Sequence, residues 1–200
     1  MKNRTIRNII VGTFVSVIFM VSTGVTAFAL AGRDYIPVTQ DYDKLEKFDS
    51  IISQLKPGQA YALADMCTDY DVLLVSDDGV YDFDGTNAAI NATIYGLDEE
   101  ENVVELGEAN SGHTAYPISV YDGCLLVGNN CGVYMYYVDT NTNDIFTRKT
   151  AQVYYEDQVP YYYYSDMETQ YEGLVDDDSR LNEMYDLYNG AVVVDFTVVE

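Results

Sequence analysis

The sequence predicts a mainly β fold of the α+β class: an antiparallel β-sandwich or barrel-like sheet with two amphipathic helices packed on it. Short runs rich in Val, Ile, Leu and Tyr alternate with clusters of Asp, Asn and Gly between residues 60 and 156, which is typical of strands and turns. The long helical crossovers that a parallel sheet requires are missing there. Helical periodicity is confined to one segment on each side of this region.

The N-terminal residues 1–29 have the three parts of a secretory signal: a basic start, a short apolar stretch and an Ala-x-Ala cleavage site. We expect cleavage after Ala29, with Ala31 as the alternative. An uncleaved anchor is the other interpretation, because weakly apolar residues run on to Leu30. The sequence therefore predicts a secreted or cell-surface bacterial protein, in which a linker (30–42) leads to a single globular domain (43–200).

The chain carries 33 acidic and 10 basic residues, a net charge of −23. Removal of residues 1–29 leaves seven basic residues and a net charge of −26. A field of this sign repels nucleic acid and anionic membrane surfaces, so we expect neither as a partner once the signal is removed.

The first helical segment covers residues 43–55. Its apolar residues recur at spacings of three and four, which places them on one helical face: Leu45, Phe48, Ile51, Ile52 and Leu55. Asp41 or Asp43 can cap its start, and Lys56-Pro57-Gly58 ends it. The apolar stripe is expected to cover a sheet.

Two segments, 60–107 and 115–152, look like copies of one module with four strands each. Both contain the pattern Leu-Leu-Val, two Asp or Asn, Gly-Val-Tyr and an aromatic residue, and Ala60-Tyr61 corresponds to Ala115-Tyr116. Extra residues near 84–93 in the first copy account for most of the mismatch. Each Leu-Leu-Val run and the Val-Tyr run after it are expected to form a hairpin.

The C-terminal part predicts a second amphipathic helix over 179–189 and a final strand over 191–199. Asp178 or Ser179 can cap the helix, and Gly190 ends it.

Asp82-Phe83-Asp84-Gly85-Thr86 has the spelling of a phosphatase nucleophile motif, in which the first Asp attacks phosphorus. In that motif a buried parallel strand runs into the first Asp, whereas a turn, Asp77-Asp78-Gly79, lies just before Asp82 here. We therefore interpret the motif as part of a hairpin. A hydrolase using Asp82 and Asp84, or a glycosidase using two unassigned carboxylates, is the alternative function.

Oxygen-rich loops suggest Ca²⁺ as a cofactor, with no other cofactor indicated. The candidate ligands are Asp139, Asn141, Asn143 and Asp144, and a second set is Asp82, Asp84 and Asn87. The first set lacks the Gly and Glu of an EF-hand loop, and Asp and Asn also make ordinary turns. A calcium-stabilised extracellular structural protein is therefore a further alternative.

Seven of the 20 Tyr residues lie in one segment, 154–171, which is the most unusual feature of the composition. Tyr combines an apolar face with a polar tip, which suits contact surfaces. We predict a ligand-binding patch formed by Tyr155, Tyr161, Tyr162, Tyr163 and Tyr164. The leading hypothesis is a secreted, non-enzymatic binding module whose ligand is a glycan, a peptide or a protein.

Cys67, Cys124 and Cys131 leave the disulfide pairing open, with Cys124–Cys131 as the pair closest in sequence. The only histidine, His113, follows Ser111 in a turn, and no nucleophile motif accompanies this pair.

The stretches "LKPGQAYA", "YDVLLVSDDGVYDFDG" and "SGHTAYPISV" resemble small exported proteins of gut Gram-positive bacteria. This resemblance implies a bacterial source and export, and no particular chemistry. The hairpins also resemble β-propeller blades, although two copies are too few for a closed propeller.

Overall fold

The computed structural model describes residues 42–66, 70–139, 142 and 144–200. The predicted leader and all but the last residue of the predicted linker lie outside these residues. No helix in the described part has the length and apolar character needed to cross a membrane.

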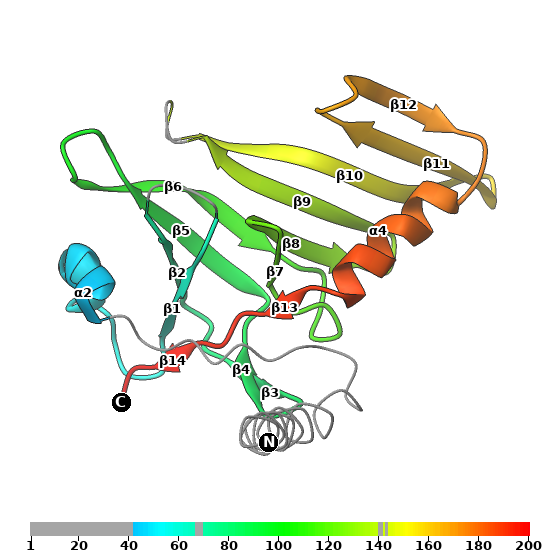
Figure 1. Ribbon diagram of the computed structural model, residues 1–200. Coiled ribbons are helices and arrows are strands. Elements are labelled where there is room, and N and C mark those ends of the chain that lie inside the picture. The colour runs from blue at the N-terminus through cyan, green and yellow to red at the C-terminus, as the bar shows by residue number, and fades with distance from the viewer. Residues whose placement is uncertain (1–41, 67–69, 140–141, 143) are drawn as a thin grey trace, which may run out of the picture.

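Two antiparallel sheets make up most of the fold, as the strand-and-turn pattern predicted (Figure 1). The first sheet has the strand order β14-β1-β2-β5-β6, and the second has the order β12-β11-β10-β9-β8-β7-β13. A separate hairpin pairs β3 with β4. None of these sheets closes into a barrel, so the arrangement is sandwich-like and the barrel-like alternative is wrong.

The strands up to β6 are β1 (Ala60–Ala64), β2 (Val72–Ser76), β3 (Tyr81–Phe83), β4 (Thr86–Ala88), β5 (Asn91–Leu97) and β6 (Val103–Asn110). The later strands are β7 (Ser119–Tyr121), β8 (Cys124–Asn129), β9 (Gly132–Asp139), β10 (Asp144–Glu156), β11 (Val159–Asp166), β12 (Tyr171–Val175), β13 (Val192–Val193) and β14 (Thr197–Val198).

The elements form four layers: helical turns, first sheet, second sheet and helix α4 (Ser179–Asn189) (Figure 1). Alternate residues of each strand enter different apolar cores because successive side chains point to opposite faces. In β2, Leu74 enters the core between the sheets, while Leu73 faces the helical turns. In β8, Leu125 faces the first sheet and Leu126 faces α4.

The N-terminal helical segment is not the continuous helix that was predicted. It consists of α2 (Tyr42–Leu45), the 3-10 turn η2 (Glu46–Phe48) and α3 (Asp49–Ile52). Its apolar stripe nevertheless packs on the first sheet, with Phe48 only 1% exposed. Neither η2 nor α3 has a side-chain cap, and helices this short depend on tertiary contact for their stability, so the sheet surface determines their geometry.

The C-terminal helix has its predicted bounds, Ser179–Asn189. Its start differs in detail, because Asp178 makes no side-chain cap and the Asp177 carboxylate accepts the Ser179 N–H at 3.0 Å instead. Gly190 ends the helix as predicted, donating its N–H to the carbonyls of Asp186 and Tyr188.

The predicted final strand is divided between the two sheets. β13 pairs with β7 in the second sheet, and β14 pairs with β1 in the first. Between them, Val194 and Phe196 enter the core between the sheets. The Phe196 N–H donates to the Asn87 carbonyl at 2.8 Å, and the Asn87 N–H donates to Asp195 at 3.0 Å. Residues 192–198 therefore form a strap across both sheets.

The predicted Leu-Leu-Val hairpin exists only in the second sheet. There β8 and β9 are joined by Asn130 and Cys131 alone. In the first sheet β2 pairs with β5, and the intervening residues 77–90 contain the separate β3-β4 hairpin. The extra residues of this region thus begin directly after β2 rather than near 84.

The two sheets share the same strand register despite this difference. Leu73 pairs with Tyr95, and Leu125 pairs with Tyr136. Each sheet thus contains a four-strand meander, β1-β2-β5-β6 in the first and β7-β8-β9-β10 in the second, and in both the pairing of the last two strands has a register shift at a corresponding position. In the first sheet the shift lies between Ile94 and Tyr95 of β5, and in the second it lies between Thr147 and Lys149 of β10. Ala60 and Tyr61 of β1 precede this shared region and pair with Ser76 and Val75.

Removal of the Phe48 ring should lower the free energy of unfolding by about 3 kcal/mol, because Phe48→Ala leaves a cavity over the first sheet. Phe146→Ala is the control, since Phe146 is 37% exposed and its main ring contact is a stack on Tyr137, so its loss should stay near about 1 kcal/mol. Urea unfolding of both variants measures the difference. An equal loss of unfolding free energy in the two variants would show that packing of the helical turns on the first sheet does not stabilise the fold.

Candidate binding site

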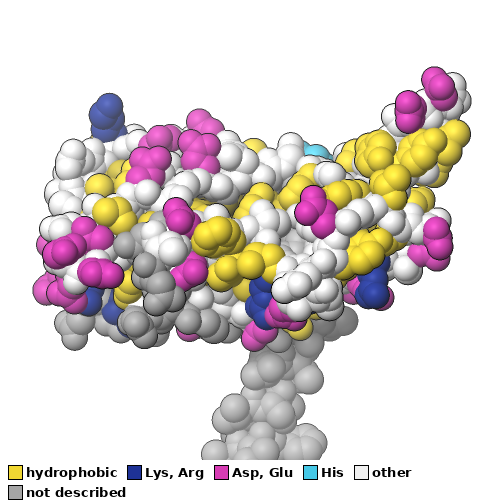
Figure 2. Space-filling model, turned by 90° about the horizontal axis from the view of Figure 1, so that it is seen from above, with side chains coloured by type: hydrophobic (Ala, Val, Ile, Leu, Met, Phe, Trp, Pro, Cys, Tyr) yellow, Lys and Arg dark blue, Asp and Glu magenta, His cyan; other side chains and the backbone are white. Residues whose placement is uncertain are grey.

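An arm formed by residues 150–175 carries the predicted tyrosine patch. It comprises the end of β10 with β11 and β12, and it extends beyond the part of the second sheet that faces the first sheet (Figure 1). Asp157 and Gln158 form its two-residue turn with positive φ angles of 50° and 67°, the backbone of a tight hairpin turn. In Figure 2 the arm projects from the body of the molecule, with acidic side chains at its tip.

The strand alternation divides the five predicted tyrosines between two faces. Tyr162 and Tyr164 contribute to the core beneath α4, and Tyr164 is 8% exposed. Tyr155 lies on the same side nearer the tip, and is 65% exposed. Tyr161 and Tyr163 point to the opposite side. The five tyrosines therefore do not share one face, because the segment is a strand, and ligand binding by them stays a prediction.

The side of the arm that faces away from α4 has no covering element in the described structure. The register places five apolar or aromatic side chains there, which we call the open face: Tyr154, Val159, Tyr161, Tyr163 and Leu174. The rings of Tyr154 and Tyr161 stack at 5.5 Å with an interplanar angle of 15°. Leu174 is 54% exposed and Val159 51%, so the face combines fixed rings with accessible aliphatic groups.

Carboxylates border the open face. The Tyr163 hydroxyl donates to the Glu172 carboxylate at 3.0 Å, and Glu156 and Asp157 lie at the tip. No Lys or Arg occurs between residues 150 and 179. The arm therefore presents an aromatic surface with an acidic rim.

A hollow of about 560 Å³ lies on the other side of the arm, against α4. Its polar wall is built around Asp166, which is 6% exposed and accepts hydrogen bonds from the Tyr164 hydroxyl at 3.1 Å and the Glu168 N–H at 2.9 Å. The Lys149 ammonium lies 3.4 Å from Asp166. Arg180 of α4 places its guanidinium 5.3 Å from the centre of the Tyr164 ring.

The environment shifts the pKa values of this group. Burial opposes ionisation of Asp166, but the Glu168 N–H, the Lys149 charge and the Tyr164 hydroxyl outweigh it and lower the Asp166 pKa. Burial and the neighbouring Asp166 charge raise the pKa of Tyr164 to about 12. The carboxylate is therefore ionised and the phenol protonated at neutral pH.

A second hollow of about 390 Å³ includes Cys124 and Arg148 in its lining. Arg148 donates from Nη1 to the Cys124 sulfur at 3.2 Å and from Nε to Glu168 at 3.0 Å. The hydrogen bond to Cys124 has the largest effect in raising the pKa of Arg148, and the hydrogen bond to Glu168 raises it further. Glu168 also lies 3.8 Å from Lys149, so it connects the charged groups of both hollows.

The Cys124–Cys131 pairing is wrong. Cys124 begins β8 and is buried, whereas Cys131 is exposed in the turn beyond its other end, and no disulfide joins the two. At about 3.3 Å per residue the length of β8 places them well beyond disulfide reach. Cys67 lies outside the described residues.

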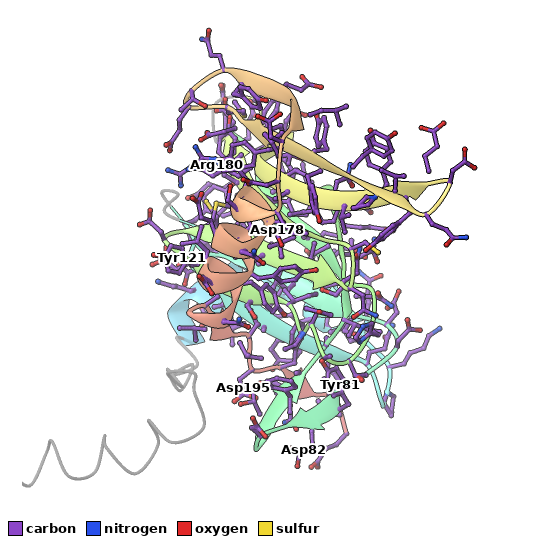
Figure 3. All side chains as sticks on the ribbon, turned by 90° about the vertical axis from the view of Figure 1, so that its right-hand side faces the viewer. Tyr81, Asp82, Tyr121, Asp178, Arg180 and Asp195 are labelled. Carbon is purple, nitrogen blue, oxygen red and sulfur yellow. The ribbon has the colours of Figure 1, made fainter. Side chains whose placement is uncertain are left out.

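Asp82 and Asp84 lie in the β3-β4 hairpin and its turn, as the turn interpretation predicted. Both are exposed, and the Asp82 carboxylate accepts the Gly85 N–H at 2.9 Å, which stabilises the turn. Figure 3 places Asp82 at one end of the molecule, far from Arg180. The parallel strand that the phosphatase motif requires is not present at Asp82, because β3 pairs antiparallel with β4.

The structure brings together only part of the predicted calcium set. Asp139 and Asp144 face each other as a strand pair at the end of the β9-β10 hairpin, while Asn141 and Asn143 lie outside the described residues. Among the residues that the structure covers, no three His, Cys, Asp or Glu side chains are grouped as a metal site. Calcium binding stays a sequence-based prediction.

His113 has the structural role expected of a turn residue. Its Nδ1 accepts the Ala115 N–H at 3.2 Å, its Nε2 lies 3.0 Å from the Asn130 side-chain oxygen, and its ring contacts Tyr116 edge-on.

Sequence reasoning missed the hollow beside α4. A signal was present, since Arg148, Lys149 and Arg180 are the only basic residues after Lys56 and all three line one hollow or the other. Their separation along the chain concealed this grouping.

Comparison with protein-family models, with curated proteins and with solved structures finds no match.

The lowered pKa of Asp166 predicts a pH-dependent effect of Asp166→Asn. Because folding lowers this pKa below its unfolded value near 3.9, the stabilisation is complete above about pH 4 and is lost as the pH falls through the folded-state value. Urea unfolding should therefore show the largest loss of stability at pH 7 and a smaller one near about pH 2.5. Asp157→Asn removes the same charge at the exposed tip and should cost little at either pH. A pH-independent loss in Asp166→Asn would contradict this account.

Proposed function

We propose that the protein is an exported, non-enzymatic binding module that holds a basic protein partner against the open face of the arm. The observation that carries this proposal is the aromatic side of β10–β12 with no covering layer among the described residues. The sandwich covers both faces of its other central strands, so this face stands out within the fold.

The side chains of the open face are suited to protein contact. Tyr residues bury a large area with little loss of side-chain entropy, and aromatic residues are enriched at the energetic centres of interfaces. The stack of Tyr154 on Tyr161 and the bond from Tyr163 to Glu172 hold three of the rings in place before binding. Such preorganisation lowers the entropy cost of association.

Charge selects the partner class. The rim of the open face is acidic, the arm lacks Lys and Arg, and the whole chain has a net charge of −23. A partner with Lys or Arg around an apolar centre is complementary, whereas a second copy of this chain is repelled. Among the three ligand classes that the sequence left open, a basic protein or peptide therefore fits better than a neutral glycan.

We also propose that the two meanders arose by duplication. The matching partners of Leu73 and Leu125, and the irregularities opposite the same point, support this proposal because the register is independent of sequence identity. The hydrolase and calcium interpretations stay sequence-based predictions.

A random peptide library tests the binding function. Peptides selected on the wild-type protein should carry Lys or Arg flanking aromatic or aliphatic residues, and their affinity should fall with rising salt. Tyr154→Ser combined with Tyr161→Ser should weaken them at least about tenfold, because it removes the stacked pair.

The matched control is Tyr155→Ser, which removes a highly exposed tyrosine from the same hairpin but from the opposite face. It should leave affinity unchanged. Equal loss in the control, selection of acidic peptides, or binding to glycans alone would each refute the proposed partner.

Export predicts a defined N-terminus. Expressed in a Gram-positive host, the protein in the medium should begin at Leu30 or, for the alternative site, at Gly32, as read by N-terminal mass spectrometry. Retention in the cell fraction with Met1 intact would favour the anchor instead.

A further inference from the structure

The hollow between α4 and the arm lies on the face of the arm opposite the open face, so the proposed function does not use it. Its residues are Lys149, Tyr164, Asp166, Thr169, Tyr171 and Val175 from the sheet and the β11-β12 turn, with Arg180, Glu183, Met184 and Leu187 from α4. At about 560 Å³ it has the size of a small-molecule site. Figure 3 shows Arg180 on α4, close to the strands of the arm.

Two cations open into this hollow with hydrogen-bonding capacity to spare. The Lys149 ammonium lies 3.4 Å from Asp166 and 3.8 Å from Glu168, both longer than the 2.7–2.9 Å typical of charged N–H···O bonds. The Lys149 side chain is only 23% exposed, so water satisfies it incompletely. Arg180 donates from Nη1 to Glu183 at 2.6 Å, which leaves donors on Nη2 and Nε.

The acceptors of the hollow are largely occupied. Asp166 already accepts the Tyr164 hydroxyl and the Glu168 N–H, and it faces Lys149. The Tyr171 hydroxyl donates to the Leu174 carbonyl at 2.8 Å. Glu183 in turn accepts from Arg180, so the remaining donors of Lys149 and Arg180 are the groups that a negatively charged acceptor can use.

The opposite wall is apolar. Met184 is buried, Val175 and Leu187 are half-buried, and all three line the hollow. An apolar group placed here would cover exposed hydrocarbon while a charged group reached Lys149 and Arg180. This combination defines the ligand by its chemistry.

We propose that the hollow binds a small amphipathic carboxylate, with the carboxylate between Lys149 and Arg180 and the apolar group against α4. A single negative charge fits, because the dianionic charge of a phosphate would meet Asp166 and Glu183 as well. An amine would face the two cations and would find the carboxylates of Asp166 and Glu183 already accepting hydrogen bonds. The carboxylate can come from a free organic acid or from a peptide C-terminus, since both present the same group.

Matched probes test the charge requirement. Octanoate, octanamide and octylamine each have eight carbons in an unbranched chain, and their binding to the full protein is followed by amide chemical shifts in the millimolar range. Octanoate should shift the amides of Tyr171, Met184 and Leu187, while octanamide and octylamine should bind at least about tenfold more weakly.

Two charge-removing variants localise the site. Arg180→Met should weaken octanoate at least about tenfold, and its side chain is 50% exposed, so the fold should tolerate the change. Lys47→Met removes the same charge from an exposed pair with Glu101, remote from α4 in sequence and structure, and should leave binding unchanged. A peptide ending in Ala-Leu and its C-terminal amide distinguish the two sources of the carboxylate.

Preference for the peptide acid identifies a chain terminus and preference for octanoate a free acid, and either supports the site. Equal binding of octanoate and octanamide, equal affinity in Arg180→Met, or no shift at the hollow with any probe would overturn it. These results are independent of the proposed function, because binding at the open face is tested separately with the variant that replaces Tyr154 and Tyr161.

Discussion

Packing between the two sheets is the constraint on which the rest of the structure depends. The core between them is completed by Val194 and Phe196, which arrive from the last residues of the chain. Because β13 joins the second sheet and β14 joins the first, a single segment fixes the relative position of both. Neither sheet alone has a covered inner face, so the apolar area buried here, at about 25 cal/mol per Å², is the main contribution that makes the sandwich stable.

The two sheets stack with their equivalent faces pointing the same way, so the front of one sheet packs on the back of the other. Leu73 and Leu125 occupy matching register positions, yet Leu73 faces the helical turns and Leu125 faces the first sheet. Stacking of this kind leaves one apolar face at each end of the pair. The helical turns around Phe48 cover one of these faces and α4 covers the other. The arm extends beyond the region where the two sheets overlap. Since α4 covers only one side of it, its other side is the open face.

Local pattern was sufficient to predict some elements and not others. The periodicity of residues 179–189 predicted α4 because its apolar face is complete within the segment. The final strand could not be predicted as two pieces, since the division at Val194 and Phe196 depends on partners in two sheets. The prediction of a hairpin between β2 and β3 was wrong for the same reason. A turn signal shows that the chain bends, but the pairing of β2 with β5 is decided by non-local register. Tyrosine clustering located the arm, whereas only strand alternation could divide its residues between two faces.

The alternation of β11 gives one tyrosine run two separate roles. Tyr162 and Tyr164 pack in the core beneath α4 and Tyr164 also lines the hollow, while Tyr161 and Tyr163 supply the open face. Charge is divided in the same way, because the later basic residues Arg148, Lys149 and Arg180 all lie around the hollows and none lies on the acidic rim. The proposed basic partner would thus meet the acidic side of the arm, while the cations that would repel it lie on the other side. Tyr163 and Tyr164 are adjacent on one strand, so the open face and the hollow share backbone although they share no lining residue.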